Sequence, residues 1–446
     1  MRILHTADWH LGNAMHTVDR AKEQEQFLNW LTQVIKDEKI EALIVAGDIF
    51  DTYGPPNWSL KLFYRFLASL LGSDCRNVVV VGGNHDSGNL LDAPSDLFDA
   101  LNIHVVGNAS NKNIEDMVFE LKDDKGNTAA ICAAVPYVSD IYLEDYCEGR
   151  SKCPDKTFSD ITYSGLYKAF LERVLELKQD KDIPLIATGH LYAAGLEGRY
   201  EGQEEEIKTD DGVRQLDVVG NLGKVHVNAF PTEFDYVALG HIHYQTRVGG
   251  SEKIRYSGSP FVMGFDEDDI KHYVLRVDLG NEDNPHALDV KKIEVPTPIL
   301  KFKRISGTVD DISNGLKDVI REAAENNDHE RYCLELYYKA EDSIAVHALV
   351  DKMDFPEKVS VVSWKIKRLE NDYTADFGAY DIRSMSSIDP EDIIRQLVLS
   401  KTYIEKGDLT EEEYKKKQDE VVNKYMPYFL AAFSEAEKNR GQNEDT

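Results

Sequence analysis

The chain has 446 residues, and its 80 Asp and Glu against 51 Lys and Arg give a formal net charge of −29 at pH 7. This balance argues against a generally basic nucleic-acid-binding surface, because phosphate binding is driven by Lys and Arg. It leaves open a local basic face, or metal ions that contact phosphate directly. The five cysteines form no Cys-x-x-Cys pair, which favours reduced thiols and a cytoplasmic location. We find no signal peptide and no apolar run long enough to span a membrane.

A recurring pattern marks the first half of the chain: a short run of apolar, strand-forming residues stops, and an Asp, Asn or His follows. The clearest example is Glu41–Asp51, in which the run ends at Gly47 and Asp48 follows at once. Four similar runs end in Asp8 and His10, in Asn84 to Asp86, in His190, and in His241 and His243. One run alone would favour a strand with an Asp-containing turn. Histidine is only 13 of 446 residues, however, so its recurrence at these ends argues for a common site.

These strand ends predict a metal centre. Ligands of open α/β sheets bind just beyond the carboxyl ends of the strands, where such side chains meet. The set offers nitrogen and oxygen donors without a thiolate, a combination that suits Mn, Fe or Zn. We therefore expect a divalent-metal site at one edge of the sheet.

Helices are expected between the strand ends. Residues 17–38, and the stretch that follows Pro55-Pro56-Asn57, repeat apolar side chains at helical spacing. Further along we expect a helix at 163–178, loops at 137–160 and 195–224, and strands at 104–106, 117–121, 129–135, 273–279 and 288–295. The alternation of strand and helix predicts an α/β fold.

Three parts are expected along the chain. Pro296 and Pro298 mark a boundary, so that residues 1–295 form the first domain. Residues 296–385 contain a β-α-β-α-β pattern without a cluster of ligand-type residues, which predicts a small α+β domain with a structural or substrate-orienting role. Residues 386–446 carry apolar helical stripes and a polar tail. The stripes can pack on the protein's own body or on a partner, and we favour a partner because a complete domain precedes them.

Taken in order, the strand ends resemble the signature of the calcineurin-like metallophosphoesterases: Asp8-x-His10, Gly47-Asp48-x-x-Asp51, Gly83-Asn84-His85-Asp86, Gly189-His190 and Gly240-His241-x-His243. The resemblance implies a β-sandwich flanked by helices, with a two-metal centre that Asp48 bridges. It implies that one metal site is completed by Asp8, His10 and His243, and the other by Asn84, His190 and His241. Two such ions lower the pKa of a bound water and neutralise charge on a phosphoryl group.

The resemblance also implies roles for residues beside the ligands. In the family, the histidine that matches His85 donates a proton to the leaving oxygen. Asp51 matches a carboxylate that orients this histidine, and a turn-capping Asp remains an open alternative for it. We assign Asp86 to turn structure or to support of the ligands. The remaining histidines, including His5, are expected to be structural or solvated.

Longer stretches resemble the SbcD family of nuclease subunits, densely through residue 295 and loosely beyond it: His5–Gly12, Gly47–Asp51, Gly83–Asp86, Phe234–His243 and Tyr256–Pro260. This resemblance implies a DNA nuclease that uses two Mn²⁺ ions, as a 3′-to-5′ exonuclease on duplex ends and as an endonuclease on single strands and hairpins. It also implies an SbcC-like ATPase partner, on which the C-terminal helices dock, and a homodimer within a heterotetramer. No stretch resembles a P-loop, so ATP binding is expected in the partner.

Two other functions stay open. One is a phosphodiesterase or phosphatase that acts on nucleotides or phosphoproteins. Protein Ser/Thr phosphatases typically carry Asp-Arg-Gly and Asn-His-Glu where this chain has Asp51-Thr52-Tyr53 and Asn84-His85-Asp86. The other is a regulatory subunit with a vestigial centre, against which the complete set of ligand-type residues argues. The acidity of the chain predicts weak DNA affinity when the partner is absent.

Overall fold

The computed structural model describes residues 1–367, except 17, 111, 144–157, 194–224, 266, 268–269, 282, 298 and 326–329, together with 416–417. The chain divides into two compact units, Met1–Arg368 and Leu369–Thr446. The loop expected at 195–224 lies outside the described residues, and so do the helices expected over 386–446, apart from residues 416–417.

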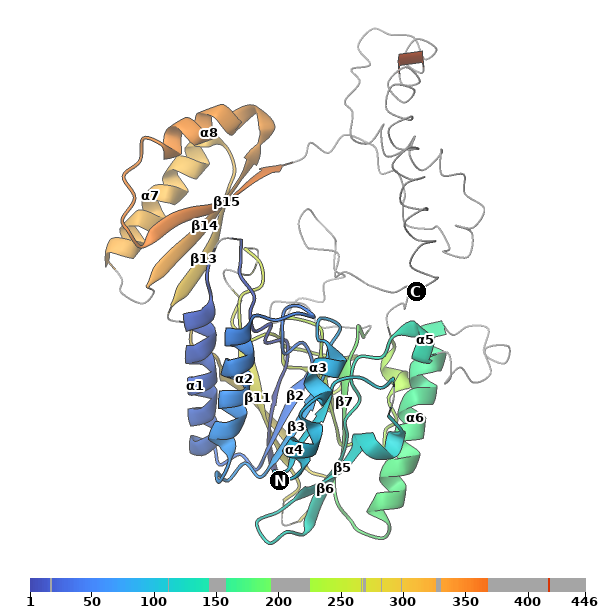
Figure 1. The fold of residues 1–446 in the computed structure, drawn as a ribbon. Helices are drawn as coiled ribbons and strands as arrows, with labels where there is room; N and C mark the ends of the chain where they lie inside the picture. Colours follow the sequence, from blue (N-terminus) through green and yellow to red (C-terminus); the bar gives the residue numbers. More distant parts are fainter. Residues whose placement is uncertain are drawn as a thin grey trace, which may run out of the picture. The chain divides into compact units, whose positions relative to one another are not determined.

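The first of two six-stranded sheets has the strand order β12-β11-β1-β2-β3-β4 (Figure 1). Strands β1 to β4 run parallel, whereas β11 is antiparallel to β1 and β12 is antiparallel to β11. The strands are β1 (Arg2–Thr6), β2 (Ala42–Ala46), β3 (Asn77–Val81), β4 (Ile103–Val106), β11 (Tyr273–Leu279) and β12 (Leu288–Glu294). Every residue of β2 and β3 is buried, as expected for continuous apolar runs that are covered on both faces.

The second sheet has the order β5-β6-β7-β8-β10-β9, with β6, β7, β8 and β10 parallel. Its strands are β5 (Val118–Lys122), β6 (Thr128–Ala133), β7 (Leu185–His190), β8 (Tyr236–Gly240), β9 (Thr246–Arg247) and β10 (Ile254–Tyr256). Ile44 and Val79 of the first sheet share one buried apolar cluster with Ile131, Ile186 and Val237 of the second. The two sheets therefore pack face to face as a sandwich.

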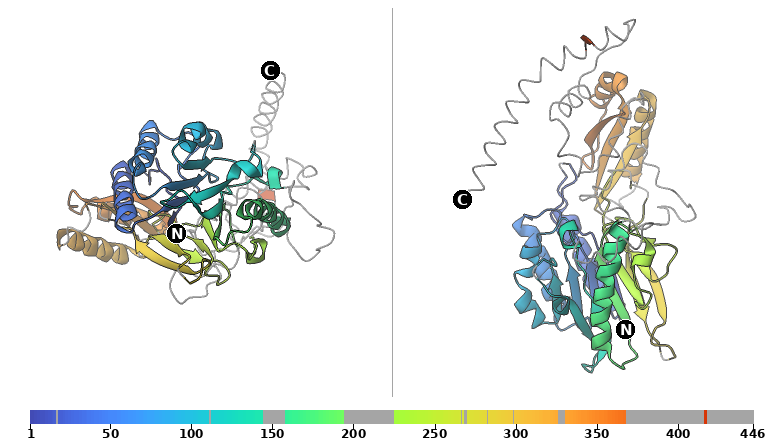
Figure 2. Two further views of the ribbon diagram at one scale, coloured as in Figure 1. Left: turned by 90° about the horizontal axis from the view of Figure 1, so that it is seen from below. Right: turned by 90° about the vertical axis from the view of Figure 1, so that its right-hand side faces the viewer.

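Helices cover the outer faces of this sandwich (Figure 2). α1 (Ala21–Asp37) and α2 (Asn57–Leu70) pack on the first sheet, and α6 (Phe158–Lys178) packs on the second. The shorter helices are α3 (Gly88–Asp92), α4 (Ser95–Asp99), α5 (Asp140–Leu143), η1 (Ile114–Met117) and η4 (Val227–Ala229). This arrangement confirms the predicted α/β class. Within the described residues, no helix has the length and apolar character that a membrane span requires.

Two local predictions need adjustment. The helix predicted from residue 17 begins at Ala21, because Val18 instead donates its backbone N–H to Met15 O (3.0 Å) and packs into an apolar cluster with Phe302. The stretch 137–160, predicted as a loop, contains α5 and the beginning of α6; residues 144–157 lie outside the described part. α5 has only four residues, too few to show a helical period, and α6 begins at Phe158, five residues before the predicted start at residue 163.

A third sheet follows the sandwich, with three parallel strands in the order β13-β14-β15. Helices lie between its strands in the chain and pack on one face of it, so the predicted β-α-β-α-β pattern is confirmed (Figure 1). The elements are β13 (Leu300–Ser306), α7 (Val309–Glu325), β14 (Arg331–Lys339), η5 (Ala340–Asp342), α8 (Ser343–Val350) and β15 (Val359–Lys367). On the sheet's other face, Leu300, Phe302 and Cys333 cluster with Met15 and Val18. We call the strands β13–β15 and their helices the cap.

Candidate metal centre

The seven side chains predicted as metal ligands lie together at one end of the sandwich. Asp8 and His10 follow β1, Asp48 follows β2, Asn84 follows β3, His190 ends β7, and His241 and His243 follow β8. Four of these residues have positive φ angles: Asp8 (54°), His10 (43°), Asp48 (50°) and His241 (99°). Residues other than glycine rarely adopt this conformation, and such strained positions concentrate at functional sites.

Asp8, His10 and His243 form the first group of potential ligands, with one donor atom from each lying within 4.8 Å of the others. His10 Nε2 lies 3.3 Å from His243 Nε2. Asp8 Oδ1 accepts the backbone N–H of His241 (2.8 Å), whereas Asp8 Oδ2 is buried and has no hydrogen-bond donor among the described residues. A buried carboxylate oxygen without a partner is costly, so this oxygen fits a position beside a cation.

Asp48, His190 and His241 form the second group. Asn84 Oδ1 lies 3.0 Å from both His190 Nε2 and His241 Nδ1, which brings a neutral oxygen ligand to the same point. His190 Nδ1 lies 3.0 Å from Ala46 O, a carbonyl that can only accept, so Nδ1 carries the proton and donates it. The other nitrogen of a neutral His190 ring is then free to bind a metal, as is usual for histidine ligands.

Asp48, a member of the second group, also lies close to the first. Its Oδ2 is 3.6 Å from His10 Nε2 of the first group and 3.3 Å from His190 Nε2 of the second. Its Oδ1 accepts the backbone N–H of His85 (2.9 Å), which fixes the carboxylate plane. A carboxylate in this position can serve two cations at once, as two-metal phosphoesterase chemistry requires.

Burial and charge set the protonation of this cluster. Burial, followed by the charge of His190, lowers the pKa of His241 to about 3, so that this ring is a neutral ligand near pH 7. Burial also raises the pKa of Asp8 to about 7, where the nearby Asp48 adds to it and His190 opposes it. For His190, burial favours the neutral ring, but the Asp48 carboxylate outweighs it and raises the pKa to about 9. Bound cations would take over the role of these protons, since metal ligands must be deprotonated.

His85 is exposed beside the first group, with its ring centroid 5.0 Å from that of His10. Its Nδ1 lies 2.9 Å from the backbone carbonyl oxygen of Asp51, which accepts the Nδ1 proton and leaves Nε2 for another partner. The Asp51 carboxylate lies elsewhere: Oδ1 is 3.3 Å from His10 Nδ1 and accepts a hydrogen bond from Asn13 Nδ2 (2.9 Å). Asp51 thus contacts His85 through its backbone and a candidate metal ligand through its side chain.

Asp86 joins the two loops that carry Asp48 and Asn84. Its carboxylate accepts the backbone N–H groups of Ile49 (3.0 Å), Phe50 (2.8 Å) and Gly83 (2.9 Å), as expected for a residue of turn structure. His5 is fully buried, with its ring nitrogens beside Tyr236 Oη and Leu239 O, which fits the structural role expected of it. Asn13 was not singled out in the sequence, because an Asn next to Gly12 is the ordinary composition of a turn.

Comparisons with known proteins agree with this geometry. A model of the calcineurin-like phosphoesterase family matches residues 1–245, more than half of the chain. The chain is 33% identical over 281 residues to the SbcD subunit of the SbcCD nuclease from Escherichia coli (strain K12), which covers 63% of this chain and 66% of that protein. The SbcD subunits of Bacillus subtilis (strain 168) and Rhodobacter capsulatus are 30% and 31% identical, over 353 and 309 residues. These two matches cover 78% and 68% of this chain, and 82% and 71% of the relatives.

The chain belongs to the SbcD family of calcineurin-like phosphoesterases. All seven candidate ligands, together with Asp51 and His85, fall inside the segment that the phosphoesterase model matches. Members of this fold family bind divalent metal ions, and the donor set of the two groups fits such ions: imidazole nitrogens, carboxylate oxygens and one amide oxygen.

Close backbone approach explains one glycine of this SbcD-family signature. Gly47 has a φ of 92°, and a Cβ atom there would overlap the imidazole of His190. We expect Gly47→Ala to destabilise the fold by about 3 kcal/mol, through overpacking and an unfavourable φ. Urea unfolding measures the change. Gly54→Ala is the matched control, because its Cβ would meet no atom within 4 Å, and an equal loss in both variants would contradict the explanation.

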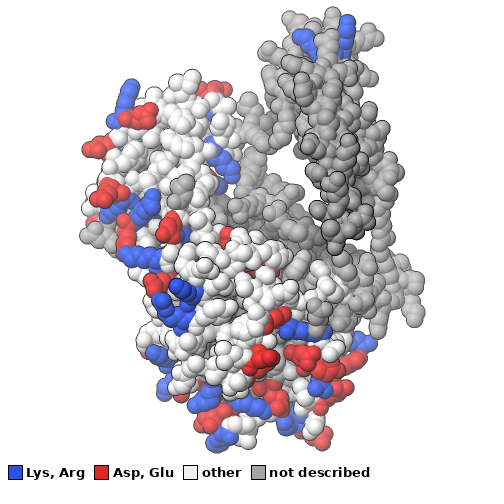
Figure 3. Space-filling view, in the orientation of Figure 1, with Lys and Arg blue, Asp and Glu red and all other residues white. Residues whose placement is uncertain are grey.

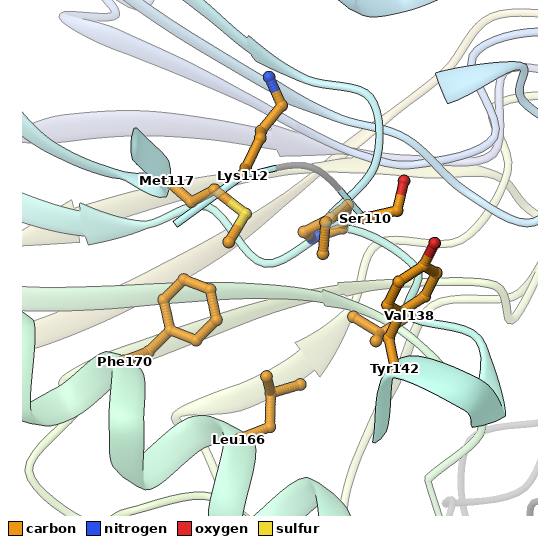
Figure 4. A pocket seen from close by; sticks show the side chains of 9 residues that line it. Ser110, Lys112, Met117, Val138, Tyr142, Leu166 and Phe170 are labelled. Carbon is orange, nitrogen blue, oxygen red and sulfur yellow. The ribbon is translucent and has the colours of Figure 1, made fainter. Parts of the chain in front are cut away.

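A separate cavity of about 250 Å³ lies beside α6 (Figure 4). Leu166 and Phe170 line it from α6, and Ser110, Lys112 and Met117 lie across from them. None of its nine lining residues belongs to the ligand groups, so this cavity is not part of the metal centre.

Proposed function

We propose that this chain is the nuclease subunit of an SbcC–SbcD-type complex and that it hydrolyses DNA phosphodiesters with two Mn²⁺ ions. The observation that carries the proposal is the pair of ligand groups, in which Asp48 of the second group also lies 3.6 Å from His10 of the first, with the exposed His85 ring beside them. The relatives are named nuclease subunits, which supports a nucleic-acid substrate. Because the chain covers 66% of the length of the E. coli relative, substrate and partner are part of the proposal.

Each residue has a chemical task in this proposal. Asp8, His10 and His243 would hold one ion, Asn84, His190 and His241 would hold the other, and Asp48 would serve both. Two divalent ions held there supply an activated water and neutralise charge on the phosphoryl oxygens. His85 is oriented by the Asp51 carbonyl, so its Nε2 can donate a proton to the leaving oxygen. Asn84 contributes no charge, which keeps the ions electrophilic.

The distribution of charge on the surface supports the proposal that the chain needs a partner to bind DNA. On the face in Figure 3, Lys and Arg side chains of the described residues are interspersed with Asp and Glu and form no continuous basic stripe. Together with the net charge of −29, this predicts weak DNA binding by the chain alone.

We propose that residues 1–295 are the nuclease domain, that 296–385 are the capping domain, and that the helices of 386–446 dock on an SbcC-like ATPase. We further propose a homodimer within a heterotetramer in the cytoplasm.

One experiment tests this function. The full chain is incubated with Mn²⁺ and a hairpin-ended DNA duplex, with and without an SbcC-like ATPase and ATP, and with EDTA as the control. We expect Mn²⁺-dependent cleavage that EDTA abolishes and that the ATPase stimulates. Turnover of small phosphodiesters without DNA cleavage, even with the ATPase present, would instead identify a phosphodiesterase of another substrate class. A purified chain that binds no metal would point to a regulatory subunit.

A further inference from the structure

A buried arginine lies where the sandwich meets the cap. The Arg20 side chain is 1% exposed, and its Cζ lies 5.3 Å from the ring centroid of Phe261 and 5.2 Å from that of Phe302. Both distances are within the range of cation–π attraction. Phe302 belongs to β13 of the cap, whereas Phe261 packs in the cluster beneath α1. The guanidinium thus contacts one ring from each part.

Polar contacts fix the direction of this guanidinium. Arg20 Nε donates to Glu23 Oε2 (2.6 Å), and Nη1 donates to Val262 O (2.8 Å). Nη1 also reaches Asn13 Oδ1 at 3.5 Å. Nη2 is buried and has no acceptor among the described residues, so Nη1 makes the group's contacts toward the metal centre.

Asn13 continues the contact toward the metal centre. Its Nδ2 donates to Asp51 Oδ1 (2.9 Å), the same oxygen that lies 3.3 Å from His10 Nδ1. An arginine can only donate and an ionised carboxylate can only accept, so the Asn13 amide has a single orientation that satisfies both neighbours. The backbone N–H of Asn13 also bonds to His10 O (2.9 Å), which holds the amide beside the ligand that it serves.

We propose that Asn13 and Arg20 are positioning residues: they fix the Asp51 carboxylate, which orients the His10 imidazole, and Phe302 of the cap holds Arg20 in place. The inference rests on the proposed two-metal function. Polar partners behind a ligating histidine fix its ring orientation and tautomer, and their loss weakens metal binding. Asp51 Oδ1 lies within ion-pair distance of His10 Nδ1 (3.3 Å), a buried nitrogen without a hydrogen-bond partner among the described residues. The affinity for one ion therefore depends on the contact between Phe302 of the cap and Arg20.

The test measures metal binding directly. Mn²⁺ is titrated into the full chain by isothermal titration calorimetry, and thermal unfolding confirms that each variant is folded. We expect Asn13→Ala to weaken one of the two ions by about 10-fold, a typical effect of losing such support, and to leave the other unchanged. Asn13→Ser keeps a donor and should lose less. Phe302→Ala should weaken the same ion by a smaller factor.

Two further variants separate positioning from general loosening. Ile299→Ala alters the same apolar cluster as Phe302 without removing a ring that faces Arg20, and it should bind Mn²⁺ as the wild type does. Asn13→Ala/Phe302→Ala should be no weaker than Asn13→Ala alone, because both act through one set of contacts. Wild-type affinity in Asn13→Ala would overturn the proposal, and so would additive losses in the double variant. A chain that binds two Mn²⁺ ions but does not cleave DNA would contradict the proposed nuclease function. The metal-binding test of Asn13 and Phe302 could still be carried out on such a chain.

Discussion

His85→Gln should lose DNA cleavage by about 10²–10⁴-fold, the range that general acid catalysis contributes, while it still binds two metal ions. His85 belongs neither to the group of Asp8, His10 and His243 nor to that of Asp48, His190 and His241, although it forms a third cluster of donor atoms with His10 and Asp51. Its Nδ1 is held by the Asp51 carbonyl. Glutamine can accept and donate hydrogen bonds but does not supply a proton near neutral pH. Cleavage rates of a duplex end in saturating Mn²⁺ measure the loss, and calorimetry measures the metal content.

The leaving group sharpens this expectation. A p-nitrophenyl ester leaves as a stable anion and needs little protonation, so His85→Gln should retain far more activity on it than on DNA. His104→Gln is the matched control, because His104 pairs with Asp99 at the end of the first sheet, away from the ligands. An equal loss on both substrates would assign His85 to substrate positioning instead of proton transfer.

Asp48→Asn should abolish cleavage and weaken Mn²⁺ binding more than any other single substitution in the cluster. Its Oδ2 lies 3.6 Å from His10 Nε2 and 3.3 Å from His190 Nε2, so one change reduces the charge offered to both ions. Substitutions that only support a ligand cost about 10–100-fold in metal affinity or activity, and the loss of a shared ligand should exceed that range. Calorimetric titration with Mn²⁺ gives both affinity and stoichiometry.

Asp96→Asn makes the same chemical change on the exposed surface of α4 and should leave both quantities intact. Retention of two tightly bound Mn²⁺ ions in Asp48→Asn would show that each group binds its ion independently. The shared carboxylate would then have no role in metal binding.

Much of the fold followed from local patterns. β2 is apolar throughout, and so is β3 after Asn77. Each strand is followed within a few positions by ligand-type residues, so one local pattern predicts both the strand and the site. The cap elements were likewise predictable, because α7 carries an apolar stripe and its flanking strands, β13 and β14, are rich in Leu and Tyr. Such short-range periodicity is the most dependable signal in a single sequence.

Other features depend on contacts between distant residues and left no such pattern. β1 pairs with β11, so that Ile3 faces Val277, and nothing local to either strand specifies the other. Asp51 contacts His85 through its backbone carbonyl and His10 through its carboxylate. This arrangement depends on the direction of the Asp51 side chain, which the Asn13 amide and the His10 ring determine. Arg20 resembled an ordinary charged residue before a helix, although it is among the most deeply buried side chains.

The ligand set has a consequence for how long the protein survives. Four of the seven candidate ligands follow strands of one sheet, and three come from the other. Bound cations would therefore link the two sheets of the sandwich. A ligand that binds only the native state raises the free energy of unfolding by about 2.7 kcal/mol at 100 times its Kd. Scarcity of the divalent metal in the cell would then shorten the lifetime of the folded chain as well as reduce its activity.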